Sequence, residues 1–176
     1  MEEITRELAR SFLPPRDPDG HKGTFGKVCV YGGDLGYTGA PVYAGEAAVR
    51  TGSGLVFVGV PEEVYPIVAG RCASAMAYPI PEGYAEHLRR IAVCDAVLIG
   101  PGLGRCWWAE GRAVALLRDL ECPVVRDADG INAAAAHIDV LEGRRSPTVV
   151  TPHEAEFRRL GGDLSPGREA AAEAFA

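Results

Sequence analysis

Four glycines lie within eight positions of the chain, at residues 32, 33, 36 and 39. They follow the apolar run Val28–Tyr31 and lead into a helix-like stretch, so the segment is typical of a strand, a tight turn and a helix start. Glycine removes side chains from the backbone and lets amide N–H groups approach an anion at the positive end of a helix. We therefore expect a phosphate-bearing ligand here, with Gly32, Gly33, Thr38 and Gly39 as the backbone loop. The alternative is a tight connection without a ligand.

A second glycine-rich segment follows the apolar run at residues 96–99. Here Gly100, Gly102 and Gly104 alternate with Pro101 and Leu103. The segment could bring the backbone close to a ligand, or it could be a simple turn imposed by Pro101.

Short polar side chains follow the strand-like residues 124–126. Asp127 and Asp129 lie two positions apart, where a β-like backbone places both carboxylates on one side. They could hold a metal ion or a ligand hydroxyl. The alternative is helix capping, with Asp129 as the N-cap. Asn132 could contact a ligand or cap the same turn.

His153 follows a further strand-like run, residues 148–150, within the sequence Thr-Pro-His-Glu. It is either a ligand contact or a hydrogen-bonded surface residue. If the strands are parallel, all four polar clusters meet at the carboxyl edge of one sheet, which is the edge at which open α/β sheets bind ligands.

Composition excludes several classes of function. Twenty-four acidic and 18 basic residues give a formal charge of −6, and no basic run reaches five residues, so nucleic acid is not an expected partner. No stretch approaches 18 consecutive apolar residues, so a membrane is not expected either. Five cysteines, without C-x-x-C spacing, favour buried thiols in a reducing cytoplasm. Neither a P-loop nor a dinucleotide fingerprint is present, and no nucleophile–base spacing indicates covalent catalysis.

Strand-like and helix-like segments alternate, which predicts an α/β fold with a mainly parallel sheet. We expect a helix and linker at residues 1–20 and a partial catalytic domain at 21–176. The expected strands are 28–31, 55–60, 96–99, 124–126 and 148–150, and the expected helices are 4–12, 41–51, 62–70, 84–91, 107–120 and 154–160, with a further helix beginning after residue 166.

Several motifs in order together resemble the ADP/ATP-dependent NAD(P)H-hydrate dehydratases. The resemblance covers residues 21 to 160 and implies a ribokinase-like fold, with a mainly parallel central sheet, helices on both faces and an incomplete C-terminus. The motifs are His21-Lys22-Gly23, Phe25-Gly26-Lys27-Val28, Gly32-Gly33, Tyr37-Thr38-Gly39-Ala40, Arg50 to Val56, Gly100 to Gly104, Asp127 to Asn132 and Thr151 to Glu154.

The resemblance implies repair of (6S)-NADH-hydrate or (6S)-NADPH-hydrate in the cytoplasm. In the family, ADP or ATP phosphorylates the ring hydroxyl with the help of Mg²⁺, and elimination of phosphate restores NAD(P)H. The family match assigns substrate binding to Ala40, the Gly102–Gly104 loop and His153, with Asp127, Asp129 and Asn132 in an acidic cleft. It implies a homo-oligomer, commonly a tetramer, and it assigns no metal ligand to this chain.

Two departures from the family pattern are tolerable: Arg126 occupies a strand position that is usually apolar, and Ala155 stands where glycine is common. A third departure affects the expected activity. In the family, a later Lys-Gly strand-loop and a Gly-Thr-Gly-Asp segment bind the nucleotide and supply the catalytic aspartate, and neither follows residue 160 in this sequence. We therefore expect an N-terminal portion of a dehydratase with impaired activity and no catalytic residue of its own. The alternatives are a ribokinase-like small-molecule kinase and a catalytically silent dinucleotide-binding module.

Overall fold

The computed structural model describes residues 3–176, and its centre is a six-stranded sheet in which every paired neighbour is parallel. All five predicted strands are confirmed. The strand at residues 76–79 was not predicted, because it is a short edge strand that ends in proline and pairs on one side, with residues 57–60. The strands are β1 (Lys27–Tyr31), β2 (Leu55–Val60), β3 (Met76–Pro79), β4 (Ala96–Ile99), β5 (Val124–Arg126) and β6 (Thr148–Val150).

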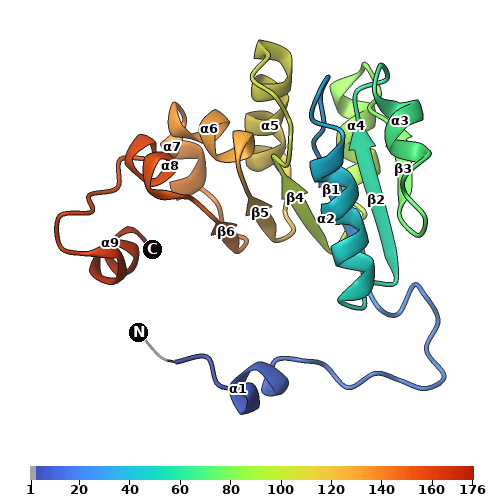
Figure 1. The fold of residues 1–176 in the computed structure, drawn as a ribbon, viewed down its shortest axis with the longest axis horizontal. Coiled ribbons are helices and arrows are strands. Elements are labelled where there is room, and N and C mark those ends of the chain that lie inside the picture. The colour runs from blue at the N-terminus through green and yellow to red at the C-terminus, as the bar shows by residue number, and fades with distance from the viewer. Residues whose placement is uncertain (1–2) are drawn as a thin grey trace.

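Helices cover both faces of the sheet (Figure 1). One face packs against α2 (Gly39–Arg50) and α3 (Tyr65–Ala69), and the other packs against α4 (Tyr84–Ile91), α5 (Trp107–Asp119) and α6 (Asp129–Ala135). Successive residues of a strand point to opposite faces. Val30 accordingly packs in the core between the sheet and α2 and α3. Its neighbours Cys29 and Tyr31 pack in the core on the opposite face, against α4, α5 and α6. Because both faces are buried, the strands are almost continuously apolar, as expected for a parallel sheet.

The strand order is β3-β2-β1-β4-β5-β6. The chain therefore builds outward from β1 to β3, returns to the other side of β1, and builds outward again to β6. Such an order creates a switch point between β1 and β4, and the connections that leave these two strands diverge to opposite faces of the sheet. Tyr31 and Ile99 are paired at the carboxyl ends of these strands, so the two glycine-rich segments begin side by side.

Three further helices lie near β6, at one side of the sheet (Figure 1): α7 (Ile138–Glu142), α8 (Glu154–Arg159) and α9 (Arg168–Phe175). The helices α6 and α7 were not predicted, because they are short and the alanines of α6 give no amphipathic period. The helix predicted at 62–70 was too long, since it begins only at Tyr65, after a turn.

The N-terminal helix α1 (Arg6–Ser11) lies apart from the sheet (Figure 1), and none of its residues is buried. The linker that follows is held by Arg16, which stacks on the ring of Phe25 and donates to the carbonyl oxygen of Gly52. Within residues 3–176, no helix has the length and apolar character needed to cross a membrane.

Candidate functional site

The two glycine-rich loops touch one another above the switch point. The Gly33 amide donates to the carbonyl oxygen of Pro101 at 3.0 Å, and the Gly100 amide donates to the carbonyl oxygen of Tyr31 at 2.9 Å. A Cβ atom on Gly32 would collide with that same Pro101 oxygen. Glycine is required at position 32 because the second loop passes directly over it. The structure thus brings together two segments whose bonded residues, Gly33 and Pro101, are 68 positions apart in the sequence.

Ala40 and Gly102 also meet. A Cβ atom on Gly102 would lie 3.3 Å from the Cβ of Ala40 and 2.6 Å from the carbonyl oxygen of Tyr37. Ala40 lies in the first turn of α2, and Thr38, the N-cap, makes no side-chain capping hydrogen bond. The positive end of the twelve-residue helix α2 therefore faces the second loop, an arrangement that suits a phosphate group.

The end of the second loop is held between two carboxylates. Gly104 has a φ of +72°, which favours glycine, and the Asp34 carboxylate fills the space that a side chain at this position would need. The Gly104 amide donates to Asp129 Oδ2 at 3.1 Å. Asp34 belongs to the first glycine-rich run, but sequence reasoning did not select it, because its importance depends on contact with a distant loop.

The prediction that the carboxylates of Asp127 and Asp129 point to the same side is wrong. Ala128, between them, has a φ of +47°, so the backbone is not β-like there. Asp127 Oδ1 accepts from Thr151 Oγ1 at 2.8 Å, whereas Asp129 turns toward Gly104. The capping alternative was also wrong in detail, since the N-cap of α6 is Ala128 and Asp129 is the first helical residue. A non-glycine residue with this backbone conformation is strained, and such strain often occurs at functional sites.

Asn132 lies one turn further along α6 and is half-buried. Its amide nitrogen donates to Asp129 Oδ1 at 3.2 Å, and its oxygen accepts from Arg159 of α8. Asn132 thus connects the acidic turn to a neighbouring helix.

His153 caps the N-terminus of α8. Its Nδ1 accepts from the amides of Ala155 and Glu156, and Glu156 accepts in return from the His153 amide at 3.0 Å, which forms a capping box. The side chain of His153 is 65% exposed, and its Nε2 lies 3.4 Å from Glu156 Oε1. The capping contacts fix the orientation of the ring while one edge stays open to solvent.

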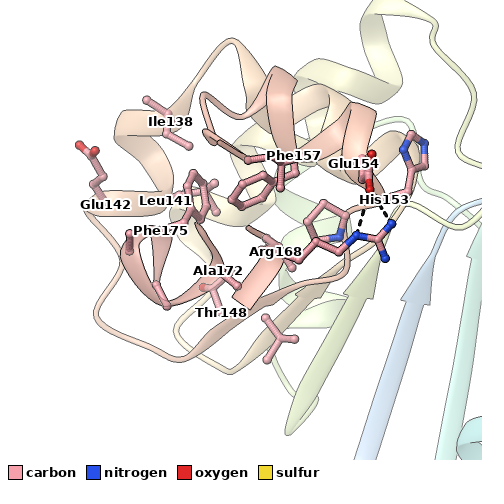
Figure 2. A pocket seen from close by; sticks show the side chains of 16 residues that line it. Ile138, Leu141, Glu142, Thr148, His153, Glu154, Phe157, Arg168, Ala172 and Phe175 are labelled. Atoms are coloured by element: carbon pink, nitrogen blue, oxygen red, sulfur yellow. Dashed lines mark hydrogen bonds and ion pairs between the residues drawn. The ribbon is translucent and has the colours of Figure 1, made fainter. Parts of the chain in front are cut away.

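A groove of about 990 Å³ lies beside β6, and its lining includes residues of α7, α8 and α9. In Figure 2, Leu141, Phe157 and Phe175 gather around this groove, whereas His153 lies at its rim. Arg168 and Glu154 form an ion pair there. The groove is not lined by the glycine-rich loops, so the candidate phosphate-binding site is a separate region of the carboxyl edge.

Arg126 is fully buried at the end of β5. Its guanidinium donates to the carbonyl oxygens of Ala113 and Gly130, and Nε has no hydrogen-bond partner. Burial lowers the pKa of Arg126 to about 10. This side chain binds the acidic turn to α5 from inside the core.

Among the described residues, His, Cys, Asp and Glu side chains form no group of three or more that could hold a metal ion. These side chains therefore provide no protein-built metal cage, and we assign no residue of this chain to Mg²⁺.

Comparison with known proteins shows which proteins this chain is similar to. The family model described as NAD(P)H-hydrate dehydratase matches residues 28–175. The bifunctional NAD(P)H-hydrate repair enzyme of Salinibacter ruber is 38% identical over 174 residues, which cover 93% of this chain and 32% of that protein.

Solved structures agree with the sequence comparison. The ADP/ATP-dependent NAD(P)H-hydrate dehydratase of Bacillus subtilis, co-crystallized with ATP and Mg²⁺, aligns with a TM-score of 0.76 at 28% identity, covering 98% of this chain and 61% of that one. A ribokinase-like superfamily protein of Enterococcus faecalis aligns with a TM-score of 0.81 at 24% identity, over 97% of this chain and 61% of that one, and shows the same fold.

The chain thus spans about a third of the length of the bifunctional relative and about three fifths of the solved structures. The family model covers nearly all of the sheet and every loop at its carboxyl edge. With its strand order and these matches, the chain belongs to the NAD(P)H-hydrate dehydratase family and has the ribokinase-like fold.

Proposed function

We propose that the chain forms the substrate-binding part of an ADP/ATP-dependent NAD(P)H-hydrate dehydratase. The observation that carries this proposal is the junction of the two glycine-rich loops at the β1–β4 switch point, joined by the contacts of Gly33 with Pro101 and of Gly100 with Tyr31. This junction, which lies beside the N-terminus of α2, suits the diphosphate of a dinucleotide.

Each site residue has a role in this proposal. The backbone amides of Thr38 and Gly39 face the diphosphate. Gly32 and Gly33, whose amides donate to the carbonyl oxygens of Gly59 and Pro101, shape the loop that lies beside it. The small side chain of Ala40 leaves room beside the Gly102–Gly104 loop. Asp127, Asp129 and Asn132 supply hydrogen-bond partners to ribose or ring hydroxyl groups, and the exposed edge of His153 orients the hydrated ring.

ADP or ATP, with Mg²⁺, is the proposed co-substrate, and the printed name and bound ATP/Mg²⁺ of the Bacillus subtilis relative support this assignment. Phosphoryl transfer requires the acceptor hydroxyl to be oriented toward the phosphate and deprotonated as it attacks. In our proposal the residues of this chain do the first task, and the base for the second lies outside them. We further propose that the protein is cytoplasmic, forms a homo-oligomer, and folds as a catalytic domain from residue 21 preceded by the α1 segment.

Two measurements on the purified chain test the proposal. The first is calorimetric binding of NADH-hydrate and NADPH-hydrate, which we expect to bind at 1:1 stoichiometry. Gly32→Leu, whose side chain collides with the Pro101 carbonyl, should abolish binding, whereas Gly111→Ala on α5, where a Cβ meets nothing within 4 Å, should bind normally.

The second measurement follows the return of absorbance at 340 nm from NADH-hydrate with ADP or ATP and Mg²⁺. We expect little turnover by the 176-residue chain and full turnover by a chain that also includes a Gly-Thr-Gly-Asp segment. Absence of both binding and turnover would refute the proposal, and rapid turnover by the short chain would refute our placement of the catalytic base.

A further inference from the structure

We infer that Arg159 is a positioning residue for the candidate substrate loop, a role that rests on the proposed function above. Arg159 lies near the end of α8 and is exposed, and its Nη1 donates to Asn132 Oδ1. A guanidinium can only donate, so this contact requires the oxygen of the Asn132 side chain to face α8. The NH₂ group of the same amide must then face Asp129.

The second step passes through Asp129. Asn132 Nδ2 donates to Asp129 Oδ1 at 3.2 Å, which leaves Oδ2 to accept from the Gly104 amide at 3.1 Å. The carboxylate is therefore held by one partner on each oxygen. If the Asn132 amide turned over, its oxygen would face Oδ1 and repel it, and the carboxylate would rotate away from Gly104.

The third step concerns the loop itself. Gly104 is confined between the carboxylates of Asp34 and Asp129. Its neighbour Gly102 packs against Ala40 at the N-terminus of α2. A movement of Gly104 therefore moves the loop beside which we place the diphosphate. Arg159 holds this loop in position through two intermediate side chains, Asn132 and Asp129.

Arg158 provides a matched control, because it is the adjacent arginine on the same helix. It pairs with Glu154 at 3.6 Å and is 59% exposed. Arg158→Met and Arg159→Met make the same chemical change one position apart, and the two variants differ in whether the bonding to Asn132 is lost.

The test measures hydrogen exchange of the Gly104 amide by NMR in the 176-residue chain. Loss of one charge-assisted hydrogen bond in the connection should speed this exchange by about fivefold in Arg159→Met. Arg158→Met should leave it unchanged, and Arg159→Lys, which retains a cationic donor, should recover part of the protection. Equal exchange rates in Arg158→Met and Arg159→Met would overturn the inference.

A double variant separates the proposed route from a general loss of stability. Because Arg159 acts through Asn132, Arg159→Met should add nothing to the effect of Asn132→Ala on the Gly104 amide. Additive effects of the two substitutions would contradict the connection. If Arg159→Met proves unstable, Arg159→Ala, which also removes the donor, takes its place in the same cycle.

Affinity for NADH-hydrate supplies the functional readout. The dissociation constant should rise about fivefold in Arg159→Met and stay constant in Arg158→Met. Absence of NADH-hydrate binding by the unmodified chain would refute the proposed function, while the exchange rate of Gly104 would still decide the role of Arg159.

Discussion

Replacing Arg126 with Met removes the largest side chain that the fold buries completely. Within the described residues no carboxylate pairs with this guanidinium, whose hydrogen bonds go to the carbonyl oxygens of Ala113 and Gly130. Both carbonyls belong to helices, α5 and α6, so they lie beside other backbone donors. The substitution therefore sets the cost of a buried charge against the value of two hydrogen bonds.

The cost of burying the charge and the value of the two hydrogen bonds are of similar size. Burial lowers the pKa of Arg126 to about 10, which corresponds to a cost of about 3 kcal/mol for keeping the side chain charged at neutral pH. Two hydrogen bonds from a charged donor contribute about 1.5 kcal/mol each at the lower end of their range. Met is long and unbranched and can occupy much of the same space. We expect Arg126→Met to change the free energy of unfolding by less than about 1 kcal/mol, whereas Arg126→Ala leaves a cavity and should cost about 3 kcal/mol.

Urea denaturation at pH 7.5 and at pH 10.5 measures how much Arg126→Met changes the free energy of unfolding and in which direction that change moves with pH. Because the pKa is lower in the folded state, the unfolded chain holds more protons above pH 10, and the wild type should gain stability relative to Arg126→Met as the pH rises through 10. A loss of more than about 3 kcal/mol in Arg126→Met, with no change between the two pH values, would refute this reasoning and show that the hydrogen bonds outweigh the cost of burial.

Three other substitutions test separate parts of the structure. Gly32→Ala places a methyl group against the Pro101 carbonyl and should lower the unfolding free energy by about 2 kcal/mol or more, measured by urea denaturation; an unchanged midpoint would contradict the close approach of the loops. Burial, and then nearby arginines, lower the pKa of His87 from 6.5 to about 3, so the unfolded state takes up a proton first as the pH falls below 6.5. The wild type should therefore lose about 2 kcal/mol relative to His87→Gln between neutral pH and pH 5, and parallel stability curves for the two proteins would rule this out. Thr151→Val removes the hydroxyl that donates to Asp127 and should cost about 1 kcal/mol in thermal unfolding, whereas Thr151→Ser should keep most of the stability.

The strands were predictable because a parallel sheet buried on both faces leaves continuous apolar runs bounded by turn residues. Leu55–Val60 and Ala96–Ile99 were identified to the residue. The segment Met76–Pro79 was missed because an edge strand needs no such run, and its pairing with β2 is decided by tertiary contact. The short helix α6 was missed for a related reason, since its alanines pack by small size and leave no periodic pattern.

The candidate site was predictable in composition and less so in geometry. Glycine-rich turns at the ends of β1 and β4 indicated backbone approach to an anion, and the sheet order places them together. The directions of Asp127 and Asp129 could not be predicted, because they depend on the positive φ of Ala128. The contact between Asp34 and Gly104 and the bond from Arg159 to Asn132 join residues distant in sequence, which no local pattern encodes.

The measurement that tests the central claim most directly is NMR mapping of backbone amides during titration with NADH-hydrate. We expect the largest shifts at Gly33, Gly39, Gly102 and Gly104, where the two loops meet, with little change at Phe157 and Ala172 in the groove beside β6. Shifts confined to the groove, or no shifts at all, would contradict the assignment of the β1–β4 switch point as the substrate site.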